Sequence, residues 1–290
     1  MIDFGKVATA MVTPFDNKEN IDFAKTTELI NYLIDNGSDS LVIAGTTGES
    51  PTLTNEEKLA LFRHVVEVVD GRVPVIAGTG SNNTRASIEM TKKAEEIGVN
   101  AVMLVAPYYN KPSQEGLYLH FKTIAESTKL PVMLYNVPGR SIVSLSVETV
   151  VRLSQLPNVV AIKDAGGDLD TMTEFIANTP DDFAVYSGDD SLTLPSLAIG
   201  ANGIVSVASH VIGNEMQEMV RLFESGHYPQ AAKQHQRLAP VMKGMFAAPS
   251  PTPVKTALQL KGLDTGPVRL PLIPLTETER TTLVQLLETL

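Results

Sequence analysis

The chain has no cysteine, no tryptophan and only five histidines among its 290 residues. The lack of cysteine excludes disulfides, thiolate nucleophiles and cysteine-based metal sites. The histidines are scattered without the spacing of zinc ligands, so we assign no metal site. Neither a G-x-G-x-x-G motif nor a P-loop is present, and we therefore expect no nucleotide or other cofactor. The histidines are His64, His120, His210, His227 and His235.

Positive charge is also scarce. The chain has 23 lysines and arginines against 33 aspartates and glutamates, which gives a formal net charge of −10 without any basic block. We therefore expect neither a nucleic-acid partner nor binding to an anionic membrane. No apolar run approaches the roughly 18 residues of a membrane span. The N-terminal stretch lacks the features of a signal peptide, so we expect a cytoplasmic protein.

What the sequence does contain is a series of short apolar runs separated by amphipathic stretches such as 54–69 and 83–98. Each run is typical of a buried strand, and the spacing fits one strand plus one crossover helix. A capping box, Thr54 followed by Glu57, marks the start of the first of these helices. The eight apolar runs are 7–13, 40–45, 73–78, 101–106, 131–136, 159–163, 183–187 and 203–207.

Eight alternating units predict an α/β fold, a (β/α)8 TIM barrel. The alternative is a doubly wound open sheet, which usually has fewer strands. After residue 207 only helical patterns follow, so we expect a C-terminal helical extension. We assign the barrel to residues 1–225 and the extension, packed on the barrel, to residues 226–290. The helical patterns are 214–226, 228–247, 251–263 and 276–290.

A lysine ends one of the buried runs, "VVAIK", just before "DAGG". Strand alternation places Val159, Ala161 and Lys163 on one face. Lys163 would then lie at the C-terminal mouth of the barrel, where active sites of this fold are built. Tyr135 occupies the same place on the preceding strand, so the two side chains would be neighbours. The alternative is a surface lysine whose stem is packed while its amine stays in water.

An amine in an apolar site favours its neutral form, because burial penalises charge. A neutral amine can attack a carbonyl carbon and form a Schiff base. A nearby tyrosine hydroxyl can then carry the protons that the reaction moves. Lys163 and Tyr135 therefore predict Schiff-base chemistry without a metal.

Two loops predicted at the same mouth could hold a small acidic substrate. In "GTTGES" 45–50, Thr46 and Thr47 present hydroxyl and N–H groups that suit a carboxylate, although an ordinary turn with a helix cap would look the same. In "VPGR" 137–140, Arg140 could take a second carboxylate, although a solvated loop arginine is common.

Two further motifs support other interpretations. In "SGDD" 187–190 we expect Asp189 or Asp190 to cap a helix rather than bind a metal. In "PYYNKPSQEG" 107–116, the adjacent Tyr108 and Tyr109 indicate either local packing or an interface.

Six motifs are spread along the chain up to the helical tail: "ATAMVTPF" 8–15, "GTTGES", "PYYNKPSQEG", "YNVPGR", "VAIKDAGG" and "SGDD". With these motifs the chain resembles the dihydrodipicolinate synthase family of class I pyruvate aldolases, in the N-acetylneuraminate lyase superfamily. The resemblance implies a Schiff-base aldol condensation of pyruvate with L-aspartate 4-semialdehyde. That reaction belongs to the biosynthesis of lysine and diaminopimelate.

The resemblance also implies catalytic roles. Lys163 would form the Schiff base with pyruvate, and Tyr135 would transfer protons. Thr47 would link Tyr135 to Tyr109, which in this family comes from the partner subunit. We therefore expect a homo-oligomer, a dimer or a tetramer, that shares Tyr109 across its tight dimer interface.

Substrate contacts follow from the same resemblance. Thr46 and Thr47 would bind the carboxylate of pyruvate, and Gly188 and Val205 would line its pocket. Arg140 would bind the carboxylate of L-aspartate 4-semialdehyde.

Two other functions compete with this one. A lyase acting on N-acetylneuraminate or another 2-keto sugar acid would share Lys163, Tyr135 and the "GTTGE" loop. Arg140 favours a short charged aldehyde over a polyol. An inactive barrel that serves as a binding module would be expected to lack Lys163 or Tyr135, and both are present.

The chain departs from relatives that are inhibited by L-lysine. Asn82 and Tyr108 match their effector site, but Asn55 and Lys58 replace two histidines and Ala86 replaces a glutamate. The effector ammonium loses an acidic contact worth about 1.5–3 kcal/mol and meets like charge instead. We predict no useful feedback inhibition by L-lysine. Initial rates at near-KM pyruvate, with lysine raised to tens of millimolar, test this, and half-inhibition below about 1 mM would contradict it.

Overall fold

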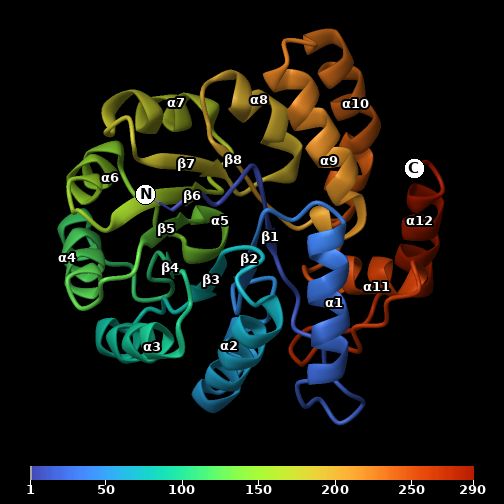
Figure 1. Cartoon of the computed structure of the whole chain (residues 1–290), viewed down its shortest axis with the longest axis horizontal. Helices are drawn as coiled ribbons and strands as arrows, with labels where there is room; N and C mark the ends of the chain where they lie inside the picture. The colour runs from blue at the N-terminus through green and yellow to red at the C-terminus, as the bar shows by residue number, and fades with distance from the viewer. Residues whose placement is uncertain (1) are drawn as a thin grey trace.

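Parallel strands close into a barrel in this computed structural model, which describes residues 2–290. Within those residues eight strands follow one another around the barrel in chain order, and β8 pairs with β1 (Figure 1). The predicted TIM barrel is thus confirmed, and the open sheet is excluded because both edges are paired. The strands are β1 Val7–Ala10, β2 Ser40–Ile43, β3 Val75–Gly78, β4 Ala101–Val105, β5 Val132–Asn136, β6 Val159–Asp164, β7 Ala184–Ser187 and β8 Gly203–Ser206.

Helices surround the barrel and continue beyond it (Figure 1). The predicted boundary at residue 225 falls in the turn between α9 and α10, and α10 and α11 pack against α9. The division into a barrel domain and an extension stays a prediction. The helices are α1 Phe23–Asp35, α2 Asn55–Val69, α3 Thr84–Ile97, α4 Gln114–Ala125, α5 Pro138–Ser141, α6 Val147–Ser154, α7 Leu169–Asn178, α8 Thr193–Ala198, α9 Ser209–Glu224, α10 Tyr228–Gly244, α11 Thr252–Leu260 and α12 Glu277–Leu287. None of the helices in residues 2–290 is both long and apolar enough to span a membrane.

The helix starts show where sequence signals succeed and fail. Helix α2 has the predicted capping box, in which the Glu57 N–H donates to Thr54 Oγ1 over 3.1 Å and the Thr54 N–H donates to Glu57 Oε2 over 2.8 Å. Helix α9 begins at Ser209, five residues before the predicted start at residue 214. Ile212 has non-helical backbone angles, and Gly213 packs so closely that a Cβ would lie 2.1 Å from the Asn36 carbonyl oxygen. Because the helix is kinked here, the sequence pattern did not predict its first turn.

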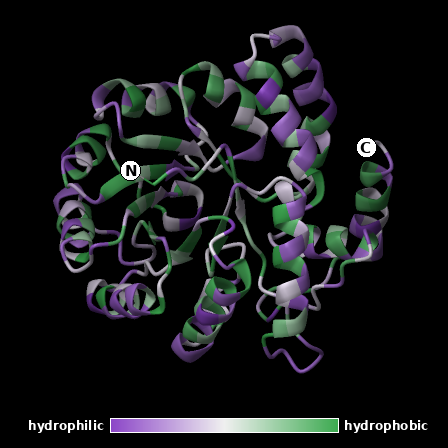
Figure 2. Ribbon diagram, viewed as in Figure 1, coloured by the Kyte–Doolittle hydropathy of each residue, from purple (hydrophilic) through white to green (hydrophobic). Residues whose placement is uncertain are grey.

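Two apolar layers fill the molecule. One layer lies between the strands and the helices, and the other fills the barrel. The strands and the inner faces of the helices are hydrophobic while the outer helix faces are hydrophilic (Figure 2). The barrel is therefore a packed core, and a substrate can enter only at its ends. Residues inside the barrel include Ala8, Ala10, Val42, Ile76, Met103, Met133, Tyr135, Ala161 and Val205.

Strand β6 departs from simple alternation. Val132 pairs with Val159 but Met133 pairs with Ala161, so Val160 is the extra residue of a bulge. Val159 packs in the outer layer, whereas Val160 and Ala161 pack inside the barrel. The prediction that Val159 shares a face with Ala161 and Lys163 is therefore wrong, because a bulge shifts the side-chain alternation by one residue. Above the bulge, alternation holds.

Candidate active site

Lys163 lies at the end of β6 and is only 5% exposed. It pairs with Tyr135 across β5 and β6, as predicted, and its Nζ lies 4.3 Å from the centroid of the Tyr135 ring. Tyr135 is equally buried, at 5% exposure. The alternative of a surface lysine with its amine in water is thereby excluded.

The loop after β2 contains Thr46 and Thr47. Thr46 is partly exposed and Thr47 is buried. The loop folds back on itself, because the Glu49 N–H donates to the Thr46 carbonyl over 3.1 Å and the Ser50 N–H donates to the Gly45 carbonyl over 3.2 Å. Within residues 2–290, the N–H groups of Thr46 and Thr47 donate to no backbone carbonyl. Free N–H groups side by side form a site that suits a carboxylate.

Neither glycine of this loop, Gly45 or Gly48, has a positive φ. Positive φ values occur instead at Ala44 (48°) and Glu49 (56°). Gly78 is required for close approach, since a Cβ there would lie 2.4 Å from Ala44 O, and Gly48 is tightly packed, since a Cβ there would lie 3.1 Å from Met11 O. The loop is therefore pressed tightly against its neighbours.

Arg140 is presented by α5, a single helical turn that follows β5. The Asn136 side chain holds the segment that follows. Its Oδ1 accepts the Leu145 N–H over 3.0 Å, and its Nδ2 donates to Ser144 Oγ over 3.2 Å. The same Nδ2 donates to Asp164 Oδ1 over 2.8 Å. Asn136 thus connects the Arg140 segment to the end of the lysine strand.

Asp164, directly after Lys163, is buried, and burial raises the pKa of its carboxyl although the Asn136 bond opposes the shift. Its carbonyl accepts the Gly188 N–H over 2.6 Å. A Cβ on Gly188 would lie 3.0 Å from Lys163 Cε and 2.8 Å from Ala165 Cβ. Gly188 therefore leaves the space that the lysine side chain occupies.

The aspartates of "SGDD" have separate structural roles. Asp189 Oδ1 accepts the Ser191 N–H over 2.9 Å and caps a short 3₁₀ helix, as predicted. Asp190 is buried, which raises the pKa of its carboxyl, and its Oδ2 accepts the Val207 and Ala208 N–H groups over 3.1 and 3.0 Å. These bonds fix the chain just after Val205. Among residues 2–290, no three His, Cys, Asp or Glu side chains are placed to hold a metal ion.

A cavity of about 390 Å³ opens at this end of the barrel. Thr46, Tyr135 and Arg140 line it together, so the structure brings three of the predicted residues to one space. Thr47, Lys163, Gly188 and Val205 are not in its lining, but Lys163 touches the Tyr135 ring that is. Several lining residues were not predicted from the sequence, among them Ser50, Leu53, Gly78, Met103, Val105, Val137 and Ser141.

Tyr109 does not reach this cavity in its own chain. Its side chain is 90% exposed, and its φ is 71°. The Asn82 Nδ2 donates to the Tyr108 carbonyl over 3.1 Å, and the Asn110 Nδ2 donates to the Asn82 carbonyl over 2.9 Å. Tyr108 lines the cavity, as does Lys58, whose pKa is lowered by burial. Tyr108 thus lines the cavity, whereas Tyr109 is exposed to solvent.

The arrangement has the parts of a Schiff-base site. It has a buried amine, an adjacent phenol, a loop with free N–H groups and an arginine on the wall of one cavity. Such a cavity suits a small substrate with a carbonyl group and carboxylates, because the amine can attack the carbonyl carbon while the loop and the arginine neutralise the charges.

Comparisons with known proteins agree with this geometry. The family model described as the dihydrodipicolinate synthetase family matches residues 3–290. Among curated proteins, the 4-hydroxy-tetrahydrodipicolinate synthase of Bacillus velezensis is 65% identical over 282 residues, which are 97% of this chain and 98% of the relative. Synthase 2 of Halalkalibacterium halodurans is 62% identical over 289 residues, which are 100% of this chain and 99% of the relative.

Solved structures give the same result. A dihydrodipicolinate synthase from Bacillus anthracis superposes with a TM-score of 0.99 at 73% identity, covering 100% of this chain and 99% of that one. The enzyme of Cyanidioschyzon merolae, solved with lysine bound, superposes with a TM-score of 0.97 at 45% identity, covering 99% and 98%.

The Gly188→Ala variant tests whether the space beside the lysine matters. The added Cβ has only 3.0 Å to Lys163 Cε, so we expect kcat/KM for the carbonyl substrate to fall by about tenfold or more. The thermal midpoint should also fall, because the added Cβ lies 2.8 Å from Ala165 Cβ, so the kinetics are measured well below that midpoint. Gly139→Ala is the matched control, because no atom lies within 4 Å of its added Cβ. Equal kinetics in both variants would contradict the assignment of this space.

Proposed function

The chain belongs to the dihydrodipicolinate synthetase family, and on that premise we propose how its barrel mouth works. The reaction is the condensation of pyruvate with L-aspartate 4-semialdehyde to 4-hydroxy-tetrahydrodipicolinate, in lysine and diaminopimelate biosynthesis. The chain is thus a lyase of the class I aldolase type. The observation that carries the proposed residue roles is the burial of Lys163 against the Tyr135 ring at the end of β6.

Lys163 is the nucleophile in this proposal. Its amine attacks C2 of pyruvate, and loss of one water gives the Schiff base. Removal of a proton from the methyl carbon then gives an enamine, because the protonated imine withdraws electrons. The enamine carbon forms the new bond to the aldehyde carbon of the second substrate, whose oxygen takes up a proton. The amino group of that substrate finally displaces Lys163 and closes the ring, which frees the amine.

Tyr135 and the loop after β2 serve the first substrate. The Tyr135 phenol lies next to the amine and carries protons to and from the reacting atoms. The N–H and hydroxyl groups of Thr46 and Thr47 hold the pyruvate carboxylate, and Thr47 connects Tyr135 to Tyr109 of a second subunit. Gly188 and Val205 close the pocket. The hydrogen bonds within the loop after β2 keep the donor groups of Thr46 and Thr47 in place.

Arg140 serves the second substrate. It lies on the cavity wall with Tyr135, where its guanidinium can hold the carboxylate of L-aspartate 4-semialdehyde in a bidentate contact. The alternative reaction, cleavage of N-acetylneuraminate or another 2-keto sugar acid, is not favoured. Curated relatives that are 62–66% identical over nearly the whole chain are named as synthases.

The same proposal includes the assembly and the location of the protein. A homo-oligomer, at least a dimer, brings Tyr109 of one subunit to the mouth of another, which is supported by its 90% exposure. A tetramer is the larger assembly that we expect from the resemblance. The cytoplasm, where pyruvate is available, is the expected location.

Trapping with borohydride tests the nucleophile. We expect one pyruvate-derived adduct per chain when borohydride is added with pyruvate, and peptide mapping by mass spectrometry should place it on Lys163. The amine is the buried nucleophile of the site, so Lys163→Ala should carry no adduct. Full labelling of Lys163→Ala would contradict the assignment of Lys163 as the nucleophile.

The role of Arg140 is tested separately. The Arg140→Ala variant should still form the pyruvate adduct. Its kcat/KM for L-aspartate 4-semialdehyde should fall about tenfold or more, as expected for the loss of a charge-assisted hydrogen bond worth about 1.5–3 kcal/mol. Arg152→Ala is the matched control, because Arg152 pairs with Glu115 at the surface over 2.8 Å. Unchanged semialdehyde kinetics in Arg140→Ala would remove Arg140 from the site.

A further inference from the structure

The C-terminal helical extension reaches the substrate loop through a buried ion pair. Glu49, inside the "GTTGES" loop, is 2% exposed, and its Oε1 lies 2.7 Å from the Nζ of Lys255 in α11. Lys255 is 4% exposed. The two residues are 206 positions apart in the sequence, and nothing in the chemistry described above uses them. A buried charge is very costly without a partner, so each residue constrains the position of the other.

The segment after α11 adds a second contact to the same carboxylate. The Arg269 N–H donates to Glu49 Oε2 over 2.9 Å. The Lys255 Nζ also donates to the Pro267 carbonyl over 2.7 Å. Both oxygens of Glu49 are therefore held by one short stretch of the extension. We call Glu49, Lys255 and Arg269 the Glu49 cluster.

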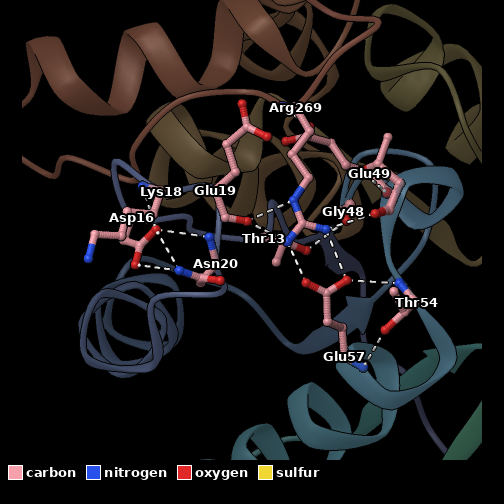
Figure 3. A network of polar contacts seen from close by, with 11 residues as sticks. Thr13, Asp16, Lys18, Glu19, Asn20, Gly48, Glu49, Thr54, Glu57 and Arg269 are labelled. Carbon is pink, nitrogen blue, oxygen red and sulfur yellow. Dashed lines mark hydrogen bonds and ion pairs between the residues drawn. The ribbon is translucent and has the colours of Figure 1, made fainter.

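The Arg269 side chain extends the connection to the surrounding loops (Figure 3). Its Nη1 donates to the Thr52 carbonyl over 2.7 Å, and its Nε donates to the Glu19 carbonyl over 2.9 Å. Its guanidinium also pairs with Glu57, the residue that closes the capping box of α2. Arg269 thus contacts two segments next to the substrate loop: the segment before α1 and the start of α2.

Both cations lie close to the same aromatic ring. The Phe15 ring centroid is 4.3 Å from Lys255 Nζ and 4.3 Å from the Arg269 guanidinium carbon. The Phe15 N–H donates to the Thr265 carbonyl over 3.0 Å. Gly266 makes this approach possible, because a Cβ there would lie 1.8 Å from the Phe15 carbonyl oxygen. The extension is therefore packed closely against the segment after β1.

The substrate loop has a conformation that needs such support. Glu49 has a φ of 56°, and a non-glycine residue held in this region costs on the order of 1–3 kcal/mol. The Gly48 carbonyl accepts the Thr13 hydroxyl over 2.7 Å, which holds the loop from the other side. Thr46 and Thr47, the proposed pyruvate ligands, are three and two residues before Glu49. A shift of Glu49 therefore displaces the donors for the carboxylate.

We propose that Glu49, Lys255 and Arg269 are positioning residues for the pyruvate site, and that the extension acts by holding the substrate loop in its binding conformation. This inference rests on the proposed function. A buried ion pair gives little net stability relative to an apolar packing of similar volume. In this proposal the ion pair instead holds the substrate loop in one conformation.

The charge on Lys255 provides a pH-dependent readout. Burial lowers the pKa of Lys255 to about 8, against the opposing effect of Glu49. The other charged groups around it are Arg269, which lowers the pKa, and Asp264, which raises it; Glu57 and Glu19 lie on the far side of Arg269. Lys255 is protonated below pH 8 and loses its proton as the pH rises through that value. The ion pair that holds Glu49 is then lost.

The Lys255→Met variant tests the proposal. Met keeps the stem and removes the charge, so we expect KM for pyruvate at pH 7 to rise by about tenfold or more while kcat changes less than about threefold. Lys261→Met is the matched control, because Lys261 closes the same helix and donates to the Val211 carbonyl over 2.8 Å. Its KM should not change. An unchanged pyruvate KM in Lys255→Met, or a fall in kcat alone, would overturn the proposal.

A second measurement tests the proposal even if Lys255→Met fails to fold. In the unmodified protein, KM for pyruvate should rise between pH 7 and 9, as Lys255 loses its proton. In Glu49→Gln the KM should be high at pH 7 already and should change little over this range. The same alkaline rise in both proteins would overturn the proposal.

Trapping separates this inference from the proposed function. At saturating pyruvate, borohydride should still fix one adduct on Lys163 of Lys255→Met, because the loop affects affinity and not the amine. If the unmodified protein gives no adduct on Lys163, the proposed function fails. If it does, and the two KM tests are negative, only the role of the Glu49 cluster fails.

Discussion

The contact between the Lys163 amine and the Tyr135 ring, 4.3 Å from Nζ to the ring centroid, is the constraint around which the barrel mouth is arranged. In the proposed mechanism the buried amine must still be reached by a substrate. The end of a barrel strand allows both burial and access, since the core lies below it and the cavity above. The bulge at Val160 allows the lower part of β6 to pack outward while Ala161 and Lys163 face inward.

Buried carboxylates hold the loops around this contact. Asp164 accepts a bond from Asn136 and so fixes the Arg140 segment, Asp190 accepts the N–H groups after β8, and Glu49 accepts the N–H of Arg269. In each case a carboxylate inside the protein accepts hydrogen bonds from a segment that is distant in the sequence. Such bonds are costly to break where water is excluded. These bonds constrain the positions of the loops around the cavity.

The sequence predicted the parts of the site that depend on local patterns. Apolar runs located all eight barrel strands, and strand ends paired Lys163 with Tyr135 correctly. The face of Val159 was predicted wrongly because a bulge leaves no mark in a run of apolar residues. Lys255 and Arg269 could not be predicted as neighbours of Glu49, since they are more than 200 residues away and each looks like an ordinary helix or loop cation. Long-range ion pairs have no local signal, so only the closed fold reveals them.

The loop after β4 shows how far one chain can build the site by itself. Tyr109 and Lys111 have φ values of 71° and 47°, and each such conformation costs on the order of 1–3 kcal/mol. Bonds from Asn82 and Asn110 keep the loop in this shape. The result is a tyrosine side chain, Tyr109, that is 90% exposed to solvent within its own chain. Tyr108, one residue earlier, lines the cavity of the same chain. The loop thus places Tyr108 at its own cavity and Tyr109 in solvent. This arrangement fits the proposed pair of subunits, in which Tyr109 of each subunit reaches the site of the other.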